Sequence, residues 1–109
     1  MENLLIDSAE RIKKGEHIAR LVKKADITFF IKCEEDSWFV HLCNGEFEIR
    51  KQSAEDKGDW LVIEGNLSSI KRFINGEDFL LSMKRRGELK AEGKLRQLLL
   101  LESIWFLTK

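Results

Sequence analysis

Residues 27–50, ITFFIKCEEDSWFVHLCNGEFEIR, contain the clearest structural signal in this chain. Three runs in this stretch alternate between apolar and polar side chains, as the strands of a half-buried sheet do. The runs cover residues 27–33, 38–43 and 46–50, and Glu34–Ser37 and Asn44-Gly45 separate them. An Asn-Gly pair between two such runs is a strong hairpin signal, because a type I′ turn needs positive φ at both central residues. The stretch therefore predicts a three-stranded antiparallel meander.

The apolar pattern also predicts how the three strands pair. We pair Cys43 with Glu46 in the second hairpin and Cys33 with Trp38 in the first. One face of the meander then carries only uncharged side chains: Ile27, Phe29, Ile31, Cys33, Trp38, Val40, Leu42, Phe47 and Ile49. The other face is mixed and wetter: Thr28, Phe30, Lys32, Phe39, His41, Cys43, Glu46, Glu48 and Arg50. A slip of one residue would move the apolar set to the wrong face, so the register is well specified.

Two helical segments are predicted before this meander. Ser8 is placed as the N-cap of a first helix that contains Ala9 and Ile12, because a serine hydroxyl can accept a hydrogen bond from the first turn. Lys14-Gly15 breaks that helix, and residues 18–25 form a second amphipathic run. Both segments are typical of helices that cover one face of a sheet.

Two strands and two helices are predicted between the meander and the final helix. Trp60–Glu64 is almost continuously apolar, which places this strand inside the sheet rather than at its edge. Asn66 is placed as the N-cap of a helix that stops at Asn75-Gly76. The inward residues of that helix are Leu67, Ile70, Phe73 and Ile74. Residues 77–86 fit a strand or a helix, and a short helix is preferred because a hairpin with the following strand would mismatch the two faces. Glu88–Glu92 is the fifth strand.

The final predicted helix, from Leu95 to Leu107, is apolar on every side. Its apolar residues are Leu95, Leu98, Leu99, Leu100, Leu101, Ile104, Trp105, Phe106 and Leu107. A surface helix of a small protein normally keeps a charged face toward water. A single contact face therefore cannot cover this helix, and its second face must meet a ligand, another subunit or neighbouring helices.

Composition limits the classes of function and partner. The 109 residues predict one domain, residues 1–109. Lys+Arg and Asp+Glu both number 19, which argues against a nucleic-acid partner. Cys33 and Cys43 lack metal-binding spacing and are too few for a disulfide framework, so we expect no metal and no cofactor. The start resembles no secretory signal, and the apolar run at 95–107 is shorter than the roughly 20 residues that span a bilayer. We expect a cytoplasmic protein without a membrane span.

The order of elements and the spacing of four glycines resemble the sterol carrier protein 2-like family. Gly65 ends a strand, Gly76 ends a helix, Gly87 precedes the last strand and Gly93 precedes the leucine-rich helix. The resemblance covers about residues 27 to 101. It implies an α+β fold with a five-stranded, largely antiparallel sheet and helices packed on one face. It also implies an apolar tunnel that holds fatty acyl chains or sterols, and no enzymatic activity.

We therefore expect the final helix to line a cavity with one face and to pack on the sheet with another. Burial of about ten methylenes there would gain roughly 8 kcal/mol, at about 0.8 kcal/mol each. The expected lining residues are Phe29, Trp38, Phe73, Phe79, Met83, Leu98, Leu101 and Trp105. The predicted function is non-catalytic binding or carriage of a fatty acid, acyl chain or other lipid. The alternative is a protein–protein interaction module that forms a homodimer through its exposed C-terminal helix.

Two polar groupings in the sequence are candidate sites. His41 lies beside Cys43 and opposite Glu48 in the predicted register, a combination that can serve nucleophilic catalysis. An open sheet face supplies no oxyanion donors, so we expect no catalytic residues. The basic run at 84–86 can receive an acidic headgroup, a coenzyme A phosphate or a membrane surface, but the mixed charge around it favours a solvated surface.

Overall fold

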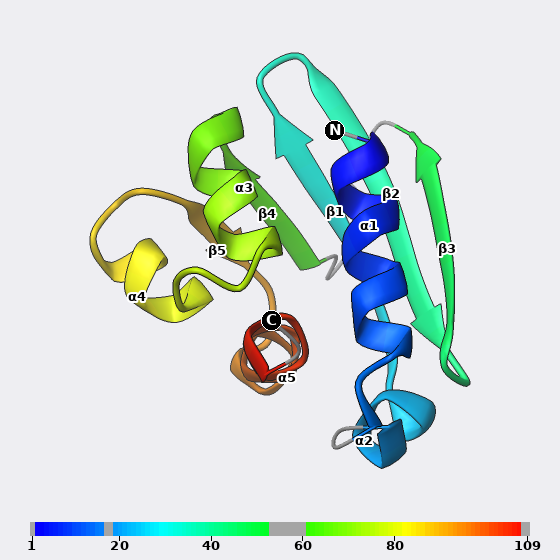
Figure 1. The fold of residues 1–109 in the computed structure, drawn as a ribbon. Coiled ribbons are helices and arrows are strands. Elements are labelled where there is room, and N and C mark those ends of the chain that lie inside the picture. Colours follow the sequence, from blue (N-terminus) through cyan, green and yellow to red (C-terminus); the bar gives the residue numbers. More distant parts are fainter. Residues whose placement is uncertain (1, 17–18, 53–60, 108–109) are drawn as a thin grey trace.

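The computed structural model describes residues 2–16, 19–52 and 61–107, which form one sheet and five helices. The elements are α1 (Glu2–Lys13), α2 (Ala19–Lys24), β1 (Asp26–Cys33), β2 (Asp36–Cys43), β3 (Glu46–Lys51), β4 (Leu61–Gly65), α3 (Leu67–Ile74), α4 (Leu80–Arg85), β5 (Lys90–Glu92) and α5 (Leu95–Leu107). Figure 1 shows α1 and α3 in front of the sheet, with α5 seen nearly end-on. Within the described ranges, no helix is both long and apolar enough to cross a membrane.

The sheet has five strands in the order β3-β2-β1-β4-β5. Its pairings are antiparallel except for β1 with β4, which run parallel. This confirms the predicted five-stranded, largely antiparallel α+β fold. The fourth strand lies between β1 and β5, inside the sheet, as its continuous apolar run predicts. Trp60, the predicted first residue of that strand, lies outside the described residues.

The register of the second hairpin is confirmed, and that of the first is wrong by two residues. Cys43 pairs with Glu46 as predicted. Cys33 pairs with Asp36 instead of Trp38. Glu34 adopts a left-handed conformation with φ 58°, which lets the chain turn over Glu34 and Glu35 alone. Because the shift is an even number of residues, every side chain keeps its predicted face.

The predicted apolar face of the meander is the floor of the core. Its members on β1 and β2 are buried, and Phe47 and Ile49 on the edge strand β3 are partly buried against the same core. The opposite face is drier than predicted, because Phe30 and Phe39 are also buried. Their rings meet edge to face at 5.5 Å, and the Arg50 guanidinium lies 4.4 Å from the centre of the Phe39 ring.

The helices confirm most local predictions and correct two. The predicted cap of α3 is present, since Asn66 Oδ1 accepts a 2.8 Å hydrogen bond from the Ser69 amide. Gly76, with φ 70°, supplies the expected left-handed stop. Residues 80–85 form the preferred helix rather than a strand. Ser8, however, lies in the middle of α1 and is not a cap. Leu67 is also wrongly placed, because this first residue of α3 is 47% exposed.

Candidate functional site

The final helix, α5, has one buried and one exposed apolar face. Its buried side chains are Leu98, Leu101, Ile104 and Trp105, each no more than 1% exposed. On other sides, Leu95, Leu99 and Leu107 are 62%, 44% and 49% exposed. The second apolar face predicted from the sequence is therefore present. The described part of the chain covers it only in part.

Trp105 joins α5 to the sheet and to α3. Its ring meets Phe29 edge to face at 5.4 Å and Phe47 at 5.8 Å, with a tilted Phe73 ring at 6.1 Å. Such aromatic pairs are worth about 0.5–1.5 kcal/mol each beyond their buried area. Trp105 is 1% exposed, so its indole fills the space between α5, β1, β3 and α3.

Arg11 of α1 links the carboxyl-terminal turns of two helices. Its Nη2 donates hydrogen bonds to the Ile74 carbonyl of α3 at 2.8 Å and to the Trp105 carbonyl of α5 at 3.2 Å. Helix carboxyl ends carry partial negative charge, which a guanidinium complements. Burial lowers the pKa of Arg11 from its usual value. These bonds hold α5 in one position relative to α1 and α3.

The exposed face of α5 meets α4 through an aromatic pair. Phe79, just before α4, stacks on Phe106 with ring centres 4.1 Å apart and planes at 25°. Phe79 remains 44% exposed. We call Phe79, Leu95, Leu99 and Phe106 the outer apolar surface. At the same contact, Glu102 of α5 accepts a 3.2 Å hydrogen bond from the Leu81 amide in the first turn of α4.

A network of two arginines and two carboxylates lies beside this surface. Asp78 Oδ2 accepts hydrogen bonds from Arg72, at 2.7 Å, and from Arg86. Glu88 Oε2 accepts from Arg86 at 2.7 Å and from Arg72 at 3.4 Å. Burial tends to raise the pKa of Asp78, but hydrogen bonds from the Phe79 amide and both arginines hold it below its usual value. Arg86 is thereby engaged within the chain, which favours the solvated-surface interpretation of the basic run.

The predicted lining residues separate into two groups. Seven are buried in one continuous core: Phe29, Trp38, Phe73, Met83, Leu98, Leu101 and Trp105. Phe79 alone among the eight lies at the surface. Trp105, itself one of the predicted lining residues, is 1% exposed and fills the space between α5 and the sheet where the cavity is expected. The cavity therefore stays a prediction.

Among the hollows that the described residues line, three lie elsewhere on the surface. The largest of them, about 340 Å³, lies beside Gly65, Glu88 and Leu89. A second, of about 310 Å³, lies where the β2–β3 turn meets α1 and α2, and a third, of about 240 Å³, lies between α1 and β3. None of these three hollows is lined by a predicted site residue.

His41 has a partner that the sequence did not predict. Glu48 lies opposite His41 across the β2–β3 pair, as expected, but it binds Arg50 at 2.9 Å. His41 Nε2 instead lies 2.9 Å from Asp26 Oδ1. Asp26 was missed because the predicted register of the first hairpin placed it beyond Cys43. The correct pairing of β1 with β2 follows from the two-residue turn at Glu34, which the sequence pattern did not predict.

Comparisons with known proteins identify the fold. No family model and no curated protein matches the sequence. A crystal structure of sterol carrier protein 2 is similar, with a TM-score of 0.68 and 14% identity, over 97% of this chain and 90% of that one. The palmitated SCP2L2 of Aedes aegypti is similar with a TM-score of 0.52 and 16% identity, over 93% and 91% of the two chains.

A larger protein contains a similar unit. The sec-alkylsulfatase Pisa1 from Pseudomonas sp. matches with a TM-score of 0.66 and 17% identity over 80% of this chain. This chain spans only 14% of the length of that sulfatase. At these identities the likeness concerns the fold, and it confirms the sterol carrier protein 2-like arrangement that the glycine spacing predicts.

Proposed function

We propose that this chain, which has a sterol carrier protein 2-like fold, binds an apolar ligand of the fatty acyl class reversibly and without transforming it. The observation that carries the proposal is the outer apolar surface, where Leu95 and Leu99 of α5 are 62% and 44% exposed. Two proteins of the same fold support the choice of ligand, since one is named a sterol carrier and the other is described as palmitated.

In this proposal the ligand enters between α4 and α5. Phe79 and Phe106 form the mouth, because their rings stack where α4 meets α5 and Phe79 remains 44% exposed. Met83 of α4 and Leu98 and Leu101 of α5, which are buried in the same core, then form the walls. The deeper residues Phe29 and Phe73 lie against Trp105, so a ligand reaches them only if that indole moves.

The energies are consistent with such an opening. Separating one aromatic pair costs about 0.5–1.5 kcal/mol beyond the apolar area that it exposes. Burial of about ten methylenes returns roughly 8 kcal/mol before the entropy of association is subtracted. Moving Trp105 would be more costly, since it contacts three aromatic rings and a buried hydroxyl. We therefore expect Trp105 to remain the inner wall while the Phe79–Phe106 pair opens.

Lipid extraction of the purified chain tests the proposal. The chain is purified under native conditions, extracted with organic solvent and examined by mass spectrometry, while a parallel sample is sized by chromatography. Fatty acid or another lipid recovered near one equivalent from a monomer supports the carrier. A lipid-free chain that also fails to bind added fatty acid contradicts it.

Dimerisation through the same surface is the second candidate function. Leu95, the most exposed apolar side chain on α5, and Leu99, one turn further along, would be covered by a second copy. Sizing across a wide concentration range distinguishes the two functions. A dimer that persists at low concentration and becomes monomeric in Leu99→Glu favours the module, whereas a monomer throughout excludes it.

A further inference from the structure

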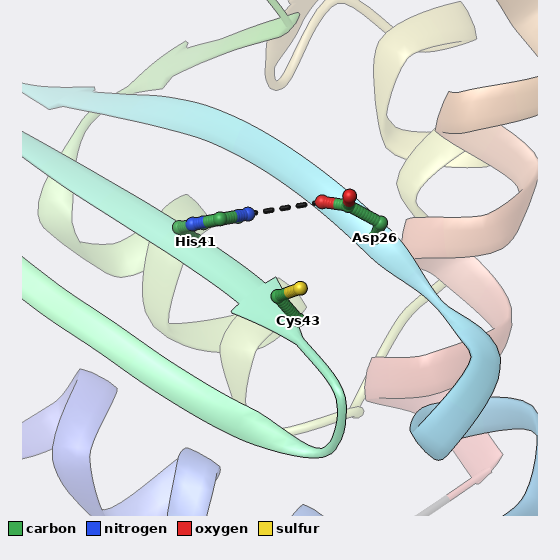
Figure 2. Close-up of side chains that lie close together, drawn as sticks. All are labelled: Asp26, His41 and Cys43. Atoms are coloured by element: carbon green, nitrogen blue, oxygen red, sulfur yellow. Dashed lines mark hydrogen bonds and ion pairs between the residues drawn. The ribbon is translucent and has the colours of Figure 1, made fainter.

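Three side chains with metal-binding chemistry meet on the face of the sheet opposite the core. Asp26 begins β1, and His41 and Cys43 lie near the end of β2 (Figure 2). Their ligand atoms, a carboxylate oxygen, an imidazole nitrogen and a thiol sulfur, all lie within 4.8 Å of one another. Figure 2 shows the His41 ring and the Asp26 carboxylate directed toward each other, with the Cys43 thiol on the same side of the sheet.

The strand register creates this cluster. Asp26 is paired directly with Cys43, and His41 is paired with Thr28, two residues further along β1. Alternate residues of a strand point to the same face, so all three side chains emerge together. In the register predicted from the sequence, Asp26 would lie opposite Gly45, away from His41. The two-residue turn at Glu34 is what brings the carboxylate to the histidine and the cysteine.

The two carboxylates nearest to this cluster are paired with basic side chains outside it. The nearby carboxylates Glu46 and Glu48 are held by Lys13 at 3.0 Å and by Arg50 at 2.9 Å. The Phe39 and His41 rings lie beside each other, with centres 6.4 Å apart and planes at 62°. Asp26, in contrast, has its carboxylate 2.9 Å from an imidazole nitrogen and 72% of its side-chain surface exposed.

We propose that Asp26, His41 and Cys43 bind one Zn²⁺ ion per chain. Zinc accepts thiolate, imidazole and carboxylate ligands together, with bonds of about 2.0–2.3 Å. Adjacent ligands of a tetrahedral ion with such bonds lie about 3.4 Å apart. The separation of 2.9 Å between His41 Nε2 and Asp26 Oδ1 is close to that edge, and the Cys43 sulfur lies within 4.8 Å of both atoms.

Binding exchanges a proton for the metal and leaves one coordination position open. The Cys43 thiol gives its proton to solvent as the Zn–S bond forms, and His41 binds through its neutral imidazole. The described residues supply three ligands, so water completes the tetrahedron, as in zinc sites that keep an open position. This site lies on the opposite face of the sheet from the α4–α5 surface proposed to bind lipid.

Cobalt substitution tests the site directly. The reduced 109-residue chain is titrated with Co²⁺ in the absence of oxygen, and sulfur-to-cobalt charge-transfer absorption is followed in the near ultraviolet. We expect saturation at one Co²⁺ per chain and displacement of the absorption by Zn²⁺. Cys43→Ser should abolish the charge-transfer band. His41→Ala and Asp26→Asn should each weaken binding at least about 10-fold, the lower limit for loss of even an outer-shell partner.

Two matched variants control for general effects of substitution. Cys33→Ser removes the other thiol, which is 6% exposed and lies on the core face. Glu48→Gln removes a carboxylate directly opposite His41 that already binds Arg50. Both should bind Co²⁺ like the unmodified chain, with folding of each variant checked by circular dichroism. An unchanged cobalt spectrum in folded Cys43→Ser, or saturation at half an equivalent through two chains, would overturn the proposal.

Discussion

The indole Nε1 of Trp105 donates a 3.3 Å hydrogen bond to the hydroxyl of Ser8, 97 residues earlier in the chain. The same hydroxyl donates to the Leu5 carbonyl at 2.8 Å. Ser8 and Trp105 are 3% and 1% exposed, so this polar pair lies inside the apolar core. A buried indole N–H usually has a partner, and for Trp105 the hydroxyl of α1 supplies it. The pair therefore specifies how α5 lies against α1.

Replacing Ser8 with alanine should destabilise the fold. Ser8→Ala leaves the Trp105 N–H buried without a partner, and we expect a loss of about 1–3 kcal/mol in the free energy of unfolding. Urea denaturation followed by tryptophan fluorescence measures this. Ser103→Ala is the matched control, because Ser103, like Ser8, lies within a helix and donates to a backbone carbonyl of the preceding turn. Its hydrogen bond to the Leu99 carbonyl, at 2.9 Å, is exposed. A change below about 0.5 kcal/mol is expected there.

Acid should weaken the network beside α4. Hydrogen bonds from Arg86 and Arg72 lower the pKa of Glu88, and those from Phe79, Arg86 and Arg72 lower the pKa of Asp78, below their usual values. A carboxylate with a depressed pKa in the folded chain contributes stability above its unfolded pKa, near about 4, and loses it as the pH falls further.

Denaturation at a series of pH values measures this contribution. We expect the unfolding free energy to fall as the pH drops below about 4, and Arg86→Gln to flatten that dependence. Arg85→Gln, at the exposed end of α4, is the control and should leave the curve unchanged. Identical curves for Arg86→Gln and the unmodified chain would show that the network adds nothing to folding.

Phe79 should matter for ligand binding more than for folding. Its ring is 44% exposed and forms one side of the proposed mouth with Phe106. We expect Phe79→Ala to weaken binding of a fluorescent fatty acid about 10-fold, which corresponds to about 1.4 kcal/mol. Leu67→Ala is the comparison, since Leu67 is 47% exposed on α3 and lies outside the outer apolar surface. Equal affinities for the two variants would exclude the α4–α5 mouth.

Gly93 should tolerate a methyl group less well than Gly87 does. Both have positive φ, 140° and 79°, so alanine is strained at either position, by about 1–2 kcal/mol. A Cβ at Gly93 would lie 2.9 Å from Leu61 Cγ, whereas a Cβ at Gly87 meets nothing within 4 Å. Gly93→Ala should therefore lose about 1–3 kcal/mol more than Gly87→Ala, the usual cost of overpacking. Thermal denaturation of both variants checks this difference.

Local sequence patterns were sufficient for most of the fold. The alternation in residues 27–50 defines which side chains face the core, and Asn66 and Gly76 mark the two ends of α3. The apolar residues on all sides of α5 predict a second exposed face, which Leu95 and Leu99 supply. These features depend on backbone geometry over a few residues, so short stretches of sequence encode them.

Partners that are distant in the sequence were decided by tertiary structure. Alternation repeats every two residues, so it cannot distinguish the predicted register of the first hairpin from one shifted by two. That ambiguity hid the meeting of Asp26 with His41 and Cys43. Ser8 resembles a helix cap in sequence because a serine before an apolar run can accept a hydrogen bond from the first helical turn. Its contact with Trp105, 97 residues later, forms only when the chain folds. The sequence determined the strands and their faces, and long-range packing decided which residues meet across them.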